Sequence, residues 1–203
     1  MTLAGAQSRM NFYKRRVKMK DSKKKLFQLL KERAIFKGKI VLSSGKISNY
    51  YIDGRMITLS PQGAYLIADI ILDMIRGEKI DAIGGPMIGA DPMVGSIAAL
   101  SHIRKKPINT FIVRKTTKSH GRMRQIEGPG LKRNSRVILV DDVATTGGAL
   151  LDSLQVLSRE GIKVEGAIVM LDRQEGATES LAKKGLRLVS IFKARDFGLS
   201  PAK

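Results

Sequence analysis

The 203-residue sequence contains no cysteine and only two histidines, His102 and His120. A chain without cysteine forms no disulfide, offers no thiolate nucleophile and cannot bind zinc or an iron–sulfur cluster through sulfur. Two histidines are too few for a metal site built from several imidazoles. The absence of cysteine also suits a reducing cytoplasm, which is where we expect the protein to work.

Long apolar runs are missing as well. The longest apolar stretch, from Ala64 to Ile75, is interrupted by Asp69 and Asp73 and is too short to span a bilayer. No apolar segment typical of a secretory signal follows the N-terminal charges. The hydrophobic fraction of 43% is typical of a globular protein. We therefore expect a soluble protein that does not bind a membrane.

Acidic residues are scarce relative to basic ones, because 18 Asp and Glu face 37 Lys and Arg, and the net charge is +19. The excess is concentrated in residues 1–33. This basic segment is either a solvated extension or a surface that attracts RNA and DNA non-specifically at low salt, since phosphate contacts follow charge. No zinc-finger spacing or aromatic stacking platform accompanies it, so we do not expect sequence-specific recognition.

The chain length predicts one domain with a small appendage. Residues 1–20 lack apolar periodicity and are predicted to form a disordered basic arm, which leaves a single domain over residues 21–203. Within that domain we expect a small N-terminal hood, mainly residues 21–58, and a core over residues 59–203. Short strands around a turn are expected in the hood segment Ile35–Thr58.

Two helix starts can be read from capping residues. Asp21 and Ser22 can cap a helix whose apolar residues, beginning with Leu26, recur at helical spacing. Ser60 followed by Pro61 predicts a second start, with Ser as the N-cap and Pro at the first helical position.

From residue 82 onward, apolar runs with strand character alternate with helical patterns. The expected strands are Ala82–Gly84, Thr110–Val113, Val137–Val140, Gly166–Leu171 and Leu188–Phe192. The expected helices are Asp91–Ile103, Gly148–Ser158 and Ala177–Lys184. Only the polar, glycine-containing segment from Arg114 to Arg136 breaks the alternation. The pattern predicts an α/β fold, a doubly wound and mostly parallel sheet flanked by helices, with ligands bound beyond the carboxyl ends of the strands.

The segment Val137–Ala149 carries the most informative pattern, in which an apolar strand ends in two carboxylates and a Thr/Gly turn leads into a helix. The backbone N–H and hydroxyl groups of Thr145–Gly148 can wrap a phosphate at the helix N-terminus. A phosphate would repel Asp141 and Asp142, so these side chains suit the hydroxyls of an attached sugar or a divalent cation. The alternative is an ordinary strand end followed by a helix cap.

The residues Val140–Gly148 read Val-Asp-Asp-Val-Ala-Thr-Thr-Gly-Gly, which resembles the signature with which type I phosphoribosyltransferases bind phosphoribosyl diphosphate (PRPP). Four further segments, in the same order along the chain, resemble orotate phosphoribosyltransferases: Leu42–Asp53, Gly84–Pro92, Val113–Gly121 and Leu171–Glu175. The resemblance extends from about Lys24 to Phe197. It implies the type I phosphoribosyltransferase fold with an N-terminal hood.

The resemblance implies a role for each matching residue. The expected PRPP-binding residues are Arg114, Lys115, Lys118, His120, Asp141, Asp142, Val143, Ala144, Thr145, Thr146, Gly147, Gly148 and Ala149. The expected catalytic residues are Lys118, His120 and Asp142, and orotate is expected to contact Thr145 and Arg173. Gly84–Met87 is expected to form a loop at the pyrophosphate. The family also implies Mg²⁺ held mainly through PRPP, and a homodimer in which Lys118 and His120 reach the partner's site on a mobile loop.

The implied reaction transfers ribose 5-phosphate from PRPP to orotate and releases pyrophosphate, a step of pyrimidine biosynthesis. Cations on the segment after Val113 would offset the negative charge that develops on the leaving group. One departure concerns Ser43, which stands where many family members have Lys; whether Ser43 or Lys46 contacts substrate stays open. The alternatives are another type I phosphoribosyltransferase with a different base, or a PRPP-sensing regulator that binds nucleic acid through the basic arm.

Overall fold

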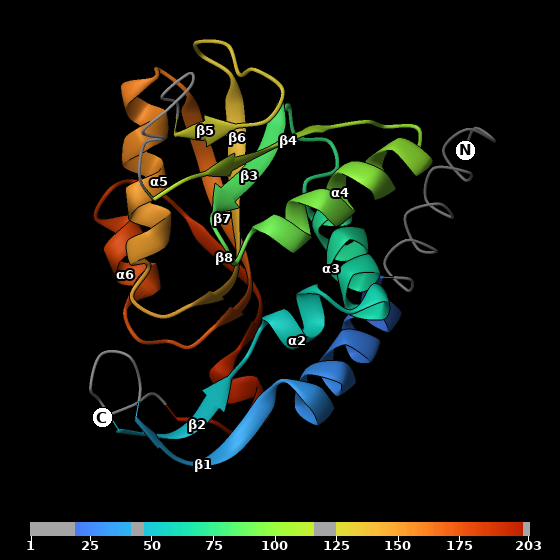
Figure 1. Ribbon diagram of the computed structural model, residues 1–203, viewed down its shortest axis with the longest axis vertical. Helices are drawn as coiled ribbons and strands as arrows, with labels where there is room; N and C mark the ends of the chain where they lie inside the picture. Colours follow the sequence, from blue (N-terminus) through green and yellow to red (C-terminus); the bar gives the residue numbers. More distant parts are fainter. Residues whose placement is uncertain (1–18, 42–46, 116–124, 201–203) are drawn as a thin grey trace, which may run out of the picture.

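The computed structural model describes residues 19–41, 47–115 and 125–200. A six-stranded sheet with the order β5-β4-β3-β6-β7-β8 forms its centre (Figure 1). Its strands are β3 (Ala82–Pro86), β4 (Asn109–Val113), β5 (Ile126–Glu127), β6 (Arg136–Ala144), β7 (Lys163–Asp172) and β8 (Leu188–Lys193). Only β5, paired with β4, runs antiparallel to its neighbour among these strands. The predicted mostly parallel sheet is confirmed.

Helices cover both faces of this sheet (Figure 1). One face carries the helix over residues 19–33, α3 (Pro61–Met74) and α4 (Asp91–Ile103), and the other carries α5 (Gly148–Arg159) and α6 (Ala177–Ala182). Along β6, Ile138 packs in the core on the α3 and α4 side, whereas Leu139 packs in the core under α5. Because both faces are buried, the strand reads as a continuous apolar run in the sequence.

A separate antiparallel hairpin precedes the main sheet. It consists of β1 (Ile35–Val41) and β2 (Ile47–Ile52), and the short helix α2 (Arg55–Thr58) follows it. Tyr50 of the hairpin packs in one buried cluster with Leu171 at the end of β7 and with Leu199, which follows the 3-10 helix η1 (Ala194–Phe197). The hairpin therefore lies close to the carboxyl end of β7.

Local predictions were partly confirmed and partly wrong. Ser60 is the N-cap of α3, and its Oγ accepts a hydrogen bond of 3.1 Å from the backbone N–H of Gly63. Ser22 is not a cap, because helical residues already precede it; its buried Oγ instead donates to Asp69 Oδ2 at 3.0 Å. The segment expected to be a polar loop contains β5, and α2 occupies residues expected to be extended. None of the helices in the described ranges is long and apolar enough to cross a membrane.

Candidate active site

Two carboxylates meet at the carboxyl end of β6, a strand that lies between β3 and β7 in the sheet. Asp141 is buried, with 8% of its surface exposed, and its Oδ1 accepts the backbone N–H of Asp142 at 3.0 Å. Asp142 Oδ1 in turn accepts the N–H of Val143 at 2.7 Å. These local bonds point both side chains to the edge of the sheet where loops from neighbouring strands gather.

Ionisation of both carboxyl groups, Asp141 and Asp142, is unfavourable in this environment. Burial raises the pKa of the Asp141 carboxyl well above its usual value, and the neighbouring charge of Asp142 raises it further. Burial also raises the pKa of Asp142, while the N–H of Val143 and the charge of Arg55 act in the opposite direction. Hydroxyl donors from a sugar would stabilise both charged forms, so the pair is suited to a polyhydroxyl ligand.

Two glycines allow other segments to approach these carboxylates. A Cβ atom on Gly89, in the loop between β3 and α4, would lie 2.2 Å from Asp141 Oδ1 and 2.7 Å from Asp142 Oδ1. A Cβ atom on Gly54, after β2, would lie 2.6 Å from Asp142 Oδ2. Both glycines line a cavity of about 310 Å³ with Asp142. No role for Gly54 or Gly89 could be predicted from the sequence, because nothing local places these residues against the acid pair.

The turn after β6 presents backbone donors at the start of α5. Gly147 is the N-cap of this twelve-residue helix with a φ of 84°, and it provides no side-chain cap. The left-handed conformation favours glycine there, and the N–H groups of the first turn are left to a ligand. Thr146, Gly148 and Ala149 are exposed, whereas the carbonyl of Thr145 accepts the N–H of Ala177 at 3.1 Å. A helix start of this kind binds anions.

Cations lie across a cavity from this helix start. Arg114 and Lys115 follow β4, and together with Gly148 and Ala149 they line a cavity of about 490 Å³. The Arg114 N–H donates to the Gln125 carbonyl at 2.8 Å, which fixes the backbone where β4 leads into this cavity. Two predicted site residues, Lys118 and His120, lie outside the described residues, as do Ser43 and Lys46. The structure thus joins two groups of predicted residues around one space.

Arg173 lies one residue beyond β7, and its backbone N–H donates to the carbonyl of Ala144 at 2.9 Å. The residue is 4% exposed, and its Cζ atom lies 4.9 Å from the centre of the Tyr50 ring. Its Nη2 atom is 2.9 Å from Glu175 Oε1. Burial raises the pKa of the Tyr50 hydroxyl, so this ring is a neutral neighbour. Glu175 has no role that its position in the sequence predicts.

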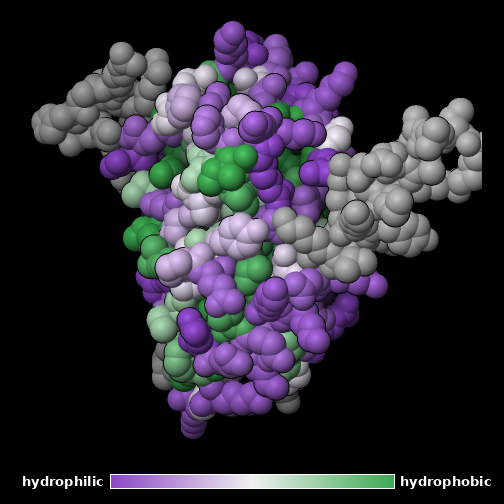
Figure 2. Space-filling model, turned by 90° about the vertical axis from the view of Figure 1, so that its right-hand side faces the viewer, coloured by the Kyte–Doolittle hydropathy of each residue, from purple (hydrophilic) through white to green (hydrophobic). Residues whose placement is uncertain are grey.

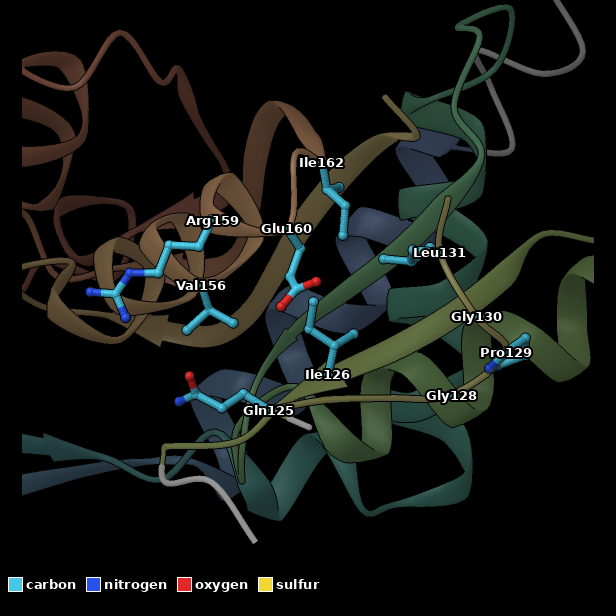
Figure 3. Close-up of a pocket in the computed structure, with 10 residues that line it drawn as sticks. All are labelled: Gln125, Ile126, Gly128, Pro129, Gly130, Leu131, Val156, Arg159, Glu160 and Ile162. Atoms are coloured by element: carbon cyan, nitrogen blue, oxygen red, sulfur yellow. The ribbon is translucent and has the colours of Figure 1, made fainter. Parts of the chain in front are cut away.

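Another cavity, of about 290 Å³, lies between β5 and the end of α5 (Figure 3). Its lining combines apolar side chains with the polar side chains of Gln125, Arg159 and Glu160, and the Glu160 carboxylate points toward Ile126 (Figure 3). None of the predicted site residues lines it. The candidate site therefore consists of the two cavities described first and of Arg173 after β7, which lines neither of them.

Comparisons with known proteins agree with this arrangement. The family described as phosphoribosyl transferase domain matches residues 55–200. The orotate phosphoribosyltransferase of Aquifex aeolicus is 40% identical over 178 residues, which cover 84% of this chain and 94% of that protein. The orotate phosphoribosyltransferase of Rhodopirellula baltica is 38% identical over 182 residues, covering 87% of this chain and 94% of that protein.

Solved structures of orotate phosphoribosyltransferases are also similar to this chain. The orotate phosphoribosyltransferase of Mycobacterium tuberculosis in complex with PRPP has a TM-score of 0.73 at 30% identity, and the match covers 88% of this chain and 99% of that chain. The orotate phosphoribosyltransferase of Aeropyrum pernix has a TM-score of 0.70 at 33% identity, with 85% of this chain and 96% of that chain covered.

Proposed function

This chain belongs to the orotate phosphoribosyltransferase family, and we propose that it transfers ribose 5-phosphate from PRPP to orotate, giving orotidine 5′-monophosphate and pyrophosphate. The observation that carries the proposal is the junction of the buried acid pair with the uncapped start of α5. The acid pair suits the hydroxyls of a ribose, and the start of α5 suits a phosphate. One short turn separates the two groups, as the two parts of one ligand require. The lack of cysteine suits the cytoplasm, where we place the reaction.

We assign the sugar and its phosphate to the segment Asp141–Ala149. The ribose hydroxyls donate to Asp141 and Asp142, which offsets the cost of burying two neighbouring carboxylates. The 5-phosphate accepts N–H groups from the turn Thr145–Gly148, where the dipole of α5 favours an anion. This division explains why two acids stand so close to a phosphate site: they face the sugar.

We assign the pyrophosphate to the cavity that Arg114 and Lys115 line. When the bond from the anomeric carbon to pyrophosphate breaks, positive charge develops on the ribose and negative charge on the leaving group. Cations placed there stabilise the transition state more than the ground state. Lys118 and His120 are assigned to the same task, and the acid pair faces the developing positive charge.

We assign Mg²⁺ mainly to oxygens of PRPP. No cluster of three or more His, Cys, Asp or Glu side chains that could hold a metal occurs among residues 19–41, 47–115 and 125–200. Asp141 and Asp142 offer the hard oxygen atoms that Mg²⁺ prefers, but they need a substrate to complete an octahedral shell. When bound, the ion supplies positive charge to the pyrophosphate.

Orotate is assigned to Arg173 and Thr145. A guanidinium pairs with a carboxylate through two parallel hydrogen bonds, which fixes the plane of the base. This contact would distinguish orotate from uracil, since uracil lacks the carboxylate.

A homodimer with shared sites forms the last part of the proposal. Ile88, which lines the cavity beside Asp142, is 61% exposed. Met56 in α2 and Leu59 directly after α2 are also exposed, by 50% and 69%. Hydrophobic patches also interrupt the hydrophilic face on the side of the molecule where α3 and α4 lie (Figure 2). Exposed apolar surface of this kind suits contact with a second subunit.

The direct test follows orotate consumption with PRPP and Mg²⁺, using uracil and adenine as competing bases. We expect turnover with orotate, a loss of orders of magnitude in Asp142→Asn, and no loss in the control Asp21→Asn, whose side chain is 59% exposed on the helix over residues 19–33. Turnover with another base but not with orotate would contradict the assignment.

For the shared site, mixing inactive Lys118→Ala with inactive Asp142→Asn should restore activity toward about a quarter of wild type, because half of random dimers then carry one intact site. No recovery after proven subunit exchange would contradict sharing.

A further inference from the structure

Arg173 is engaged by its own chain before any substrate arrives. Its guanidinium is almost fully buried, with the Tyr50 ring on one side and the Glu175 carboxylate 2.9 Å from Nη2. A buried guanidinium without a counter-charge is strongly unfavourable, so Glu175 stabilises the empty site. Glu175 is itself largely buried, since 16% of its side chain is exposed.

The contact between Arg173 and Glu175 is close but poorly directed. Arg173 Nε and Nη2 form no hydrogen bond within the described parts of the chain, and neither does Glu175 Oε1. The pair is therefore held by charge rather than by the aligned bonds of a forked guanidinium–carboxylate pair. The edge formed by Nε and Nη2 is the edge to which a planar carboxylate binds with two parallel bonds.

We propose that Glu175 is a placeholder for the carboxylate of the base: it neutralises Arg173 in the empty site, and orotate displaces it from Nη2 on binding. This inference rests on the proposed function. Orotate brings a carboxylate that can align with both nitrogens, so it replaces a poorly directed contact with a well directed one. A neutral base cannot make this exchange and leaves the internal pair in place.

The exchange makes Glu175 a specificity-determining residue that acts through Arg173. Its carboxylate competes with orotate, so its removal should tighten orotate binding. Without Glu175, a neutral base would leave Arg173 buried and unpaired, so the preference for orotate over uracil should rise. A residue that only supported the structure would have the opposite effect on orotate, because loss of support weakens binding.

The test measures KM for orotate and for PRPP in wild type and in Glu175→Gln, which keeps the shape of the side chain and removes its charge. We expect KM for orotate to fall about five- to tenfold, the effect of one competing charge, while KM for PRPP stays unchanged. The ratio of the inhibition constant of uracil to KM for orotate should rise. Glu179→Gln removes an equal charge from an exposed position on α6 and should leave all three values at wild type.

Glu175→Asp provides a second variant should Glu175→Gln fail to fold. It keeps the charge but withdraws the carboxylate by one methylene, so KM for orotate should fall by a smaller factor. An unchanged or raised KM for orotate in the folded variants overturns the placeholder role while the proposed function stands. A wild-type protein that does not consume orotate overturns the proposed function and this inference with it.

Discussion

Replacement of Arg104 by alanine should lower the free energy of unfolding by about 3 kcal/mol, because it removes the cation from two buried or partly buried carboxylates. Arg104 follows α4 and forms an ion pair through Nη2 with Asp69, which is 0% exposed on α3. Its Nη1 atom lies 3.0 Å from Asp73 Oδ1. Ser22 donates to the second oxygen of Asp69, so this cluster joins three helices.

The magnitude follows from the burial of the two partners. Breaking a buried pair by removing one partner costs about 3–5 kcal/mol, because the remaining charge is left uncompensated. The Arg104 side chain is 20% exposed, so water reaches the ion pairs. The loss of stability should therefore lie at the lower end of this range of free energies. For a chain of this size, about 3 kcal/mol corresponds to a fall in Tm of about 6–12 °C.

Urea unfolding followed by circular dichroism at one protein concentration measures this loss. Arg76→Ala is the matched control, because Arg76 Nη2 lies 3.9 Å from the same Asp73 oxygen but is 36% exposed. An exposed pair of this kind should contribute less than about 1 kcal/mol. Equal losses in both variants would refute the reasoning.

Three further predictions concern the site and the N-terminus. Asp141→Asn should abolish turnover yet raise Tm at pH 7.5 more than at pH 4.5, because the raised pKa of Asp141 makes the folded state lose stability as pH rises from about 4; an unchanged Tm difference would contradict this. Gly89→Ala should reduce turnover at least about tenfold by displacing the acid pair, whereas Gly95→Ala, with open space around its Cβ, should leave turnover unchanged. Deleting residues 1–18 removes five positive charges and no acids, so retention on heparin should weaken while turnover and Tm stay the same; unfolding of the truncated protein would show that this segment is structural.

Much of the architecture could be predicted because the signals are local. The strand Val137–Val140 reads as buried on both faces, and the structure places its residues alternately in two cores. The cap at Ser60 involves a residue only three positions away, so its pattern is complete in the sequence. By contrast, β5 has two residues and depends on pairing with β4, which no periodicity reveals. The sequence predicted Ser22 as a helix cap. Its hydrogen-bond partner, the Asp69 carboxylate, is distant in the chain, so no local pattern reveals this contact.

The candidate site divides in the same way. The sequence by itself determined the family, the mostly parallel sheet and the order of acids, hydroxyls and glycines after β6, since each is encoded in contiguous residues or a regular period. Only the tertiary structure decided that Gly89 approaches Asp141, and that Tyr50 and Glu175 enclose Arg173. Such contacts depend on how the helices and the hairpin pack against the sheet. Packing brings together side chains that are far apart in the chain, and their spacing in the sequence does not predict that they are in contact.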